Sequence, residues 1–495
     1  MRPRQEFFRR HTEAGLTEIE WVAADPLLKA AGRVGAAVIV AAGPWLVSVV
    51  ALALISVTMT PVLGYAAVED LRLTVVYAFC IAPLAAGPVG AIAARQISAQ
   101  IEMGETGPVA ELFLSAALLS GMTAQVLALV VSLTLGIGPA SILVGFVSLT
   151  VAAALLWTCF SVLAAMNSYT FLIAAFTGGM ILSVACMTVV DIPTTEVLIW
   201  SFSAGISLCV ALSMRHIQRR FACDYQTIVP TFRELLALLR RHAVLCAGVL
   251  FAICGIWVDK WVFWFSPSAA RSTAGFLHSS GYDSVMFLAH LSAIPTYAGL
   301  LLFHRSDLVA AIEGFRKSLE DRATYGLLRR RIDQLERVSW SGIVTIACVQ
   351  AGVTIGFVMM SPVIVDKFDF NFDQLLILRV GLIAVFFHSI LFLFCTLLLV
   401  ANRIRHFALV QGGFLVSNLL LSVILQSTIG MSAYAMLASA ILSAVICFRF
   451  AFMSIRAYDY QVFVTENEAL YVPRYYVVAW LLMRWNVIKR SSLQT

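Results

Sequence analysis

The sequence predicts an all-α membrane protein with about twelve transmembrane helices in two six-helix lobes and both termini in the cytoplasm. Of its 495 residues, 60% are hydrophobic and only 13% are charged, and the mean hydropathy is +0.89. A soluble core could not bury that much apolar surface. Apolar runs of about 20 residues, the length that crosses a hydrocarbon core, give the helix count, and a basic segment after the sixth run divides the lobes.

The apolar runs recur along most of the chain, and short turns at Gly136–Pro139 and Met166–Thr170 separate two neighbouring pairs. An even number of spans places both termini on the same side of the membrane. The expected spans are 34–59, 73–95, 108–135, 139–165, 169–190, 194–214, 243–265, 283–303, 339–363, 375–401, 405–428 and 431–455.

The basic residues indicate which side holds the termini. If the termini are inside, all but five of the 34 Lys and Arg residues are cytoplasmic. The exceptions are Arg72, Lys260, Arg271, Lys367 and Arg379. Because cytoplasmic loops are enriched in Lys and Arg, this pattern predicts cytoplasmic termini and accounts for the net charge of +6 without a nucleic-acid partner. Acidic residues such as Glu69 and Asp70 are expected to decorate short outer loops.

The same pattern predicts the domain organisation. The expected segments are 1–33, a cytoplasmic N-terminal segment; 34–214, the N-terminal lobe; 215–242, a cytoplasmic linker; 243–456, the C-terminal lobe; and 457–495, a cytoplasmic tail. The N-terminal segment lacks the apolar core of a cleavable signal, so the first span is expected to direct insertion. Six spans, a basic linker and six more spans are typical of transporters whose pathway runs between two related halves.

Residues 304–338, a cytoplasmic segment within the second lobe, have the pattern of an amphipathic helix pair. Apolar residues recur at helical spacing and basic residues lie opposite them. The basic candidates are Arg316, Lys317, Arg329, Arg330 and Arg331. One interpretation is a helix pair that lies on anionic lipid headgroups, which basic amphipathic segments commonly bind. The other is a docking surface for a cytoplasmic partner.

The span 243–265 carries Asp259 and Lys260 near its outer end. At 100° per residue, Trp257, Trp261 and Trp264 share an arc of about 60°, which Lys260 borders, while Asp259 points nearly the opposite way. If the tryptophans form an interfacial belt against lipid, Asp259 faces other helices, where ionisable groups mark a pathway or a structural partner. Lys260 is expected to reach the headgroups, which the shorter Asp259 cannot do, and the alternative role for Asp259 is a local ion pair or an interfacial cap.

Helix-breaking residues give further pathway candidates. Pro44 and its neighbour Trp45 lie in the first span, Pro88 lies in the second and Pro295 in the eighth. Proline removes a backbone donor and kinks a helix, and unwound backbone at membrane depth survives only where protein or water surrounds it. At each site the alternative is an ordinary packing kink.

The remaining polar residues and cysteines of the spans are expected to be structural. Interhelical hydrogen bonds are expected from His290, Gln350, Asn402 and Asn418. Nine of the ten cysteines lie in apolar runs, with no CxxC pair and no Cys/His cluster, so neither a disulfide frame, a metal site nor any other cofactor is indicated. No P-loop, GxSxG or HExxH motif occurs, so we expect no enzyme activity.

Two stretches carry specific motifs. The first is Ala14–Val50, above all Gly43-Pro44-Trp45-Leu46. The second is Gly255-Ile256-Trp257-Val258-Asp259-Lys260-Trp261, followed by Phe263–Pro267, Tyr282-Asp283 and Ile294-Pro295. These stretches resemble the PelG family of Pel exopolysaccharide transporters, and the similarity extends over roughly Ala14–Tyr460.

The resemblance implies an inner-membrane protein with twelve spans, in the superfamily that includes multidrug and lipid-linked-sugar exporters. It also implies export of Pel, a polymer rich in N-acetylgalactosamine, and three partners: a cytoplasmic glycosyltransferase (PelF-like) and membrane subunits (PelD-like and PelE-like). A neutral sugar polymer is best held by aromatic faces and by amide or hydroxyl groups. Trp45 and Trp257 are the first aromatic residues to test.

Other functions fit parts of the same pattern. A flippase for lipid-linked oligosaccharides or a drug exporter has the same two-lobed layout. A membrane scaffold that only anchors a glycosyltransferase is an alternative of another class, and a polytopic glycosyl ligase is a third, although its catalytic group would need a larger outer loop. Polymer synthesis or an ion gradient would supply the driving force.

Overall fold

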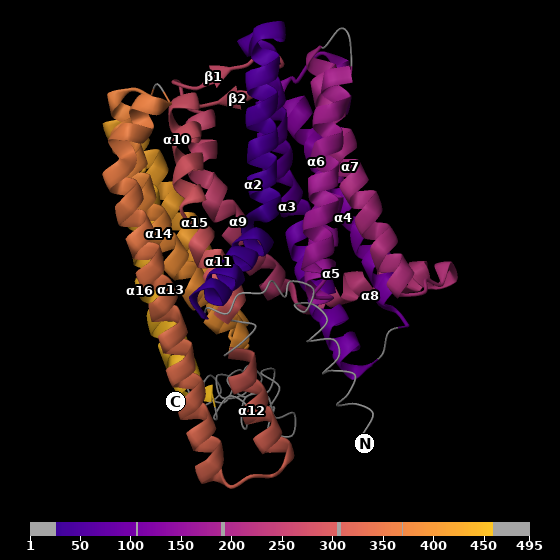
Figure 1. Cartoon of the computed structure of the whole chain (residues 1–495), viewed down its shortest axis with the longest axis vertical. Helices are drawn as coiled ribbons and strands as arrows, with labels where there is room; N and C mark the ends of the chain where they lie inside the picture. Colours follow the sequence, from indigo (N-terminus) through magenta and orange to yellow (C-terminus); the bar gives the residue numbers. More distant parts are fainter. Residues whose placement is uncertain (1–25, 105–106, 190–193, 304–307, 369, 459–495) are drawn as a thin grey trace, which may run out of the picture.

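The computed structural model describes residues 26–104, 107–189, 194–303, 308–368 and 370–458 (Figure 1). For residues 26–36, 39–42 and 44–45 it describes the backbone alone. Within these ranges, twelve helical segments are long and apolar enough to cross a membrane, as the sequence predicts. The fold is almost entirely helical, and its one described sheet is a two-stranded hairpin.

Six long helices form the N-terminal lobe. They are α2 (Pro26–Leu63), α3 (Tyr65–Met103), α4 (Val109–Leu135), α5 (Ala140–Ala165), α6 (Tyr169–Val189) and α7 (Thr195–Arg220). Helix α5 packs on α3, α4 and α7, and α6 packs on α7. The two predicted short turns are confirmed, since α4 ends before Gly136 and α6 begins at Tyr169.

The C-terminal lobe follows a linker that contains η2 (Tyr225–Thr227) and α8 (Ile228–Arg241). Its helices are α9 (Ala243–Trp264), α10 (Ser280–Leu291), α11 (Ile294–Phe303), α12 (Val309–Glu320), α13 (Tyr325–Lys367), α14 (Phe372–Val400), α15 (Ile404–Ile429) and α16 (Tyr434–Arg456). Strands β1 (Ala270–Arg271) and β2 (Leu277–His278) lie between α9 and α10. Helix α9 packs on α15, and α14 packs on α10, α13 and α16.

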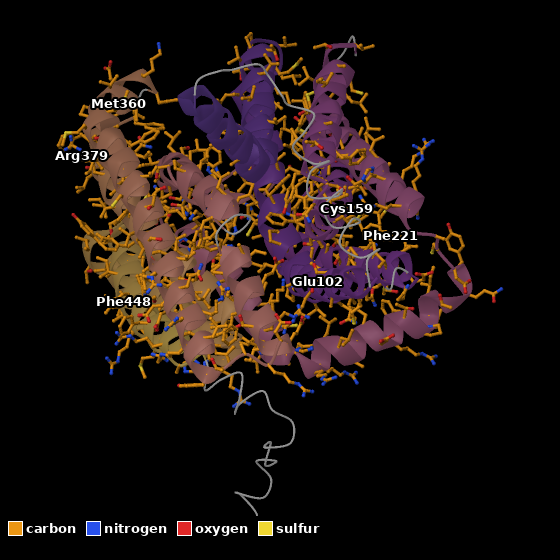
Figure 2. All side chains as sticks on the ribbon, turned by 60° about the horizontal axis from the view of Figure 1, so that its bottom comes forward. Glu102, Cys159, Phe221, Met360, Arg379 and Phe448 are labelled. Atoms are coloured by element: carbon orange, nitrogen blue, oxygen red, sulfur yellow. The ribbon has the colours of Figure 1, made fainter. Side chains whose placement is uncertain are left out.

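The lobes meet where α3 packs on α9 and α2 packs on α11. The largest cluster of buried apolar side chains runs through both lobes and includes Phe113, Phe202 and Phe414. Figure 1 shows the β hairpin at one end of the molecule and α12 at the other, which we call the hairpin end and the α12 end. Figure 2, turned so that the α12 end comes forward, shows Phe448 in one lobe and Phe221 in the other.

The eighth predicted span is broken into two helices. Helix α10 ends at Leu291 and α11 begins at Ile294, one residue before Pro295. Gln350 of α13 fills the break: its side-chain N–H donates to the Ser292 carbonyl at 2.7 Å, and its oxygen accepts from the Thr296 hydroxyl at 2.8 Å. The interhelical role predicted for Gln350 is therefore confirmed. So is that of Asn418, which donates to the Gly255 carbonyl of α9 at 3.0 Å.

The segment 304–338 is not a separate helix pair, because its second half belongs to α13, a single helix of 43 residues that continues through the ninth span. Helix α12 packs against the first turns of α13, and both lie beyond the rest of the bundle (Figure 1). Phe315 of α12 and Leu328 and Ile332 of α13 are buried together. Protein therefore covers these apolar faces, whereas a helix pair that lies on the lipid surface would bury them in the membrane.

We predict that Gln350→Leu lowers the free energy of unfolding by about 1–2 kcal/mol, because the Ser292 carbonyl and the Thr296 hydroxyl lose their partner in an apolar interior. Denaturation of the purified protein in micelles, followed by tryptophan fluorescence, measures the change. The matched control is Gln226→Leu, at an exposed side chain of η2, where we expect a change within about 0.5 kcal/mol. Equal effects at the two positions would contradict the assignment.

Candidate functional site

Asp259 and Lys260 form an ion pair that is shielded from lipid and water. Asp259 is 0% exposed and Lys260 is 7% exposed, and 3.4 Å separates Asp259 Oδ1 from Lys260 Nζ. The Tyr282 hydroxyl of α10 donates to the other carboxylate oxygen at 2.6 Å, and Lys260 Nζ also donates to the Ile256 carbonyl at 3.1 Å. Each charge therefore has an opposite charge and a hydrogen-bond partner, as burial in an apolar medium requires.

The orientation expected for Asp259, toward other helices, is correct, but the one expected for Lys260 is wrong. Its ammonium group is buried rather than directed to the headgroups, and it lies 5.8 Å from the centre of the Trp257 ring. The reason is the adjacent carboxylate, since an ammonium group with a buried counter-ion and an aromatic face does not need to reach water.

The tryptophan arc faces the other lobe instead of forming a lipid-facing belt. Trp264 is 2% exposed and stacks on Tyr77 of α3, with ring centres 4.6 Å apart. Its indole N–H donates to Asp283 Oδ2 at 2.8 Å. The Trp261 side chain lies close to Cys80, also on α3. The arc therefore forms one side of the seam between the lobes, and α3 forms the other.

Helices α3 and α9 remain in contact further along the seam. At Gly87 of α3, a Cβ atom would lie 2.6 Å from Ile253 Cδ1 of α9, so the two helices approach each other closely here. The two lobes are therefore in contact at three positions along α3: Tyr77, Cys80 and Gly87. The two small cavities that we describe, of about 180 Å³ each, lie elsewhere in the C-terminal lobe and have apolar linings.

The proline candidates have different outcomes. Helix α3 continues without a break through Pro83 and Pro88, whose side chains are buried, so the expected unwinding is absent there. Pro295 lies in the first turn of α11, beside the break that Gln350 fills. Pro44 and Trp45 belong to α2, but their side chains lie outside the part that the structure describes.

The basic docking candidates lie at the α12 end, away from the buried ion pair. Arg316, Lys317 and Arg330 are exposed. Arg316 pairs with Glu320 and Arg329 with Asp333, each at 3.5 Å. Arg331 instead donates to Gln334 at 3.1 Å and packs near Gly314 of α12, so it supports the α12–α13 contact.

Sequence reasoning missed the residues that tie the seam to the hairpin. Asp70 was expected on the surface of an outer loop, but it is 2% exposed and accepts a hydrogen bond from the Ala274 N–H at 3.1 Å. That expectation is wrong because the hairpin covers the start of α3. Tyr77, Tyr282 and Asp283 were not selected either. The motif Tyr282-Asp283 was the one signal for Tyr282 and Asp283, and Tyr77 had none.

The comparisons agree on the class of protein. The model of the PelG family, described as "Putative exopolysaccharide Exporter (EPS-E)", matches residues 22–463. A search of curated proteins gives no match.

Solved structures of MATE transporters are similar in fold. A variant of the Vibrio cholerae MATE transporter VcmN has a TM-score of 0.59 and 13% identity, with 86% of this chain and 97% of that chain covered. An outward-facing multidrug resistance MATE transporter of the MOP superfamily has a TM-score of 0.53, 14% identity, and coverage of 86% and 96%. An inward-facing structure has a TM-score of 0.53, 13% identity, and coverage of 86% and 95%. The chain therefore has the fold of a multi-pass membrane transporter.

We predict that Asp259→Asn and Lys260→Met each lower the free energy of unfolding by about 3 kcal/mol, because each leaves the other charge buried without its counter-ion. The double variant should lose about 1.5 kcal/mol or less, since both charges are gone. Denaturation of all three proteins in micelles gives the coupling energy. The control pair is Arg316→Met with Glu320→Gln, whose side chains are 69% and 67% exposed and whose coupling should stay below about 0.5 kcal/mol. Additive effects at Asp259 and Lys260 would contradict the buried pair.

Proposed function

Because the chain belongs to the PelG family of exopolysaccharide exporters, we propose that it carries Pel, or a closely related polymer rich in N-acetylgalactosamine, out of the cytoplasm along the seam between its lobes. The observation that carries the proposal is the aromatic lining of that seam. Tyr77 comes from one lobe, and Trp257, Trp261 and Trp264 come from the other.

An aromatic lining suits a neutral sugar polymer. The apolar face of a sugar ring packs on an aromatic ring, and this contact does not depend on which residue of a repeating chain is present. A polymer can therefore advance by one sugar and find equivalent contacts. A cluster of exposed charges would favour an ionic substrate instead, and the Asp259 and Lys260 charges beside this seam are buried and paired with each other.

In this proposal Asp259 and Lys260 hold the tryptophans that line the pathway in position. Asp259 couples α9 to α10 through Tyr282, and Lys260 lies between Asp259 and the Trp257 ring. Asp283 fixes the Trp264 indole through its N–H. These contacts hold the tryptophans in one orientation while the opposite lobe moves.

We place the α12 end in the cytoplasm and the hairpin end on the far side of the bacterial inner membrane. The support is the distribution of Lys and Arg, which gather at the α12 end and in the linker. This orientation puts both termini in the cytoplasm. It also puts the exposed Arg316, Lys317 and Arg330 where a soluble synthase can reach them.

We assign these three basic residues to the docking of a PelF-like glycosyltransferase. The helical hairpin of α12 and α13 extends beyond the other helices and its apolar faces are already covered, so a partner would bind its polar surface. Partners within the membrane, PelD-like and PelE-like subunits, would contact the lipid-facing sides of the lobes.

A second candidate function is export of a drug or of a lipid-linked oligosaccharide. The observation that favours it is the fold shared with the multidrug resistance MATE transporters. A scaffold that anchors the synthase without transport is the candidate of another class. These functions differ in what crosses the membrane, so a transport assay separates them.

The test is uptake of labelled polymer into inverted vesicles that contain this protein and its synthase. We expect polymer in the lumen with the native chain. Trp261→Ala should lower the uptake rate about tenfold, because a lost aromatic contact costs about 1.4 kcal/mol, and Trp261→Phe should retain most of it. The control is Trp157→Ala, at a side chain 41% exposed on the other lobe, which should export normally.

Each negative outcome has a distinct meaning. No polymer in the lumen with the native chain and an active synthase would overturn polymer export and leave the scaffold. Uptake of a cationic dye without polymer would favour the drug exporter. Normal polymer uptake by Trp261→Ala would remove the aromatic seam from the pathway.

Charge reversal at Arg316, Lys317 and Arg330 should release the glycosyltransferase into the soluble fraction, because these residues carry exposed positive charge on the α12–α13 hairpin. Fractionation of membranes measures the release. The control is reversal of Arg240 and Arg241 on α8, which should leave the enzyme bound. Retention in both cases would contradict the docking assignment.

A further inference from the structure

The segment 266–279, which joins α9 to α10, belongs to the C-terminal lobe but lies against the N-terminal lobe. Its strands β1 and β2 are antiparallel, with Ala270 opposite His278 and Arg271 opposite Leu277. Figure 1 shows this hairpin crossing from one lobe toward the other. We call residues 266–279 the bridging hairpin.

The tip of the bridging hairpin is held by a carboxylate of the other lobe. Asp70 of α3 accepts hydrogen bonds from the Thr273 hydroxyl and from the Ala274 N–H, the latter at 3.1 Å. The Ala274 carbonyl accepts from the Gly138 N–H, in the turn between α4 and α5, at 3.2 Å. Both backbone groups of Ala274 are therefore bonded across the lobe boundary.

Further polar contacts lie on both sides of the tip. The Tyr77 hydroxyl donates to the Leu277 carbonyl at 2.7 Å, and the Arg271 guanidinium donates to the Leu135 carbonyl at the end of α4. His278 Nε2 lies 3.7 Å from a Glu69 carboxylate oxygen. The contacts come from α3, α4 and the turn before α5, so three parts of the N-terminal lobe surround the bridging hairpin. We call this surface of the N-terminal lobe the seat.

The apolar side chain of Phe276 also packs into the seat. Phe276 is 0% exposed, and its ring centre lies 5.0 Å from that of Tyr77 and 5.5 Å from that of Phe146. The preceding residue, Gly275, has a φ of 98°, and a Cβ atom there would lie 3.0 Å from the Gly136 carbonyl oxygen. The turn therefore needs glycine both for its backbone angle and for its approach to the seat.

The base of the bridging hairpin is fixed to its own lobe. The Ser279 N–H donates to Asp283 Oδ2 at 3.0 Å, the same oxygen that accepts from the Trp264 indole. Gln374 of α14 donates to the Gly281 carbonyl at 3.2 Å. A movement of the C-terminal lobe is thus transmitted to a tip that is bonded to the N-terminal lobe.

The seam is different toward the α12 end. There α3 and α9 meet through apolar contacts, such as that of Gly87 with Ile253. Burial lowers the pKa of His242, just before α9, and the positive charges of Arg95 on α3 and of Arg241 lower it further. The described polar contacts between the lobes thus concentrate at the hairpin end.

We propose that the bridging hairpin is a latch that holds the lobes together at the hairpin end and must leave its seat on the N-terminal lobe before the seam can open there. The contacts define the latched state. The role of its release in export rests on the proposed function, whereas the existence of the latch does not. The experiment therefore has one arm without transport and one arm with it.

The first arm measures exposure of the tip. Ala274 is 2% exposed in the latched state, so a cysteine there should react slowly with a membrane-impermeant maleimide. Adding Asp70→Ala removes the acceptor for two hydrogen bonds, and we expect the labelling rate to rise at least fivefold. The control substitution is Asp366→Ala, an exposed carboxylate at the same end, and the control probe is Ser268→Cys, which is exposed throughout.

The second arm locks the tip in its seat. The double variant Gly138→Cys and Ala274→Cys puts thiols on two residues joined by a backbone hydrogen bond. A Cβ atom at Gly138 meets nothing within 4 Å, the Ala274 Cβ included, so a short disulfide-forming bis-thiosulfonate cross-linker is used to bridge the two thiols. We expect the cross-link to lower polymer uptake at least tenfold, and a reductant to restore it. Each single-cysteine variant and the native chain, treated in the same way, should be unaffected.

The outcomes separate the two proposals. Equal labelling of Ala274→Cys with and without Asp70→Ala would overturn the latch, whatever the transported substrate. Full uptake by a chain shown by mass spectrometry to be cross-linked would show that opening does not require release. If the native chain takes up no polymer, the proposed function fails, and the labelling arm still decides the latch.

Discussion

A single carboxylate oxygen, Asp283 Oδ2, connects the aromatic face of the seam to the base of the bridging hairpin. It accepts from the Trp264 indole at the seam and from the Ser279 N–H at the base of the bridging hairpin. Inside an apolar medium such donors must be satisfied by protein. The bonds of Asp283 therefore fix the aromatic face and the hairpin relative to each other. Through them, the aromatic face of the seam and the base of the bridging hairpin share one acceptor.

Most of the fold follows from features that sequence reasoning handles well. Hydrophobic runs of membrane length are strong signals, and they give the helix count, the turns around Gly136 and Met166, and the two-lobed layout. The helix pair expected in the segment 304–338 is present as α12 and the first turns of α13, but the change in polarity at its end does not mark the end of a helix. Helix α13 has favourable residues on both sides of that boundary and continues across it.

The site was harder to predict, because helical periodicity says which residues share a face and not what that face contacts. The tryptophan arc and the opposed Asp259 were found in this way, but periodicity left open whether the arc faces lipid or the pathway, and Trp264 lies against Tyr77 of the other lobe. Lys260 was assigned to the headgroups because its length permits that position, although its adjacent carboxylate holds it inside. Asp70 lies near a span end, which suggests a solvated loop. Its partners are about 200 positions later in the sequence, and no local pattern links them.

The uninterrupted course of α13 joins the two ends of the C-terminal lobe with one element. At 1.5 Å per residue its 43 residues reach about 64 Å, from the turns that pack with α12 to the hairpin end. A rod of that length, pivoting at one end, converts a tilt of roughly 5° into a displacement of roughly 6 Å at the other. A small change in the tilt of this one helix would therefore shift the opposite end of the lobe by about the pitch of one helical turn.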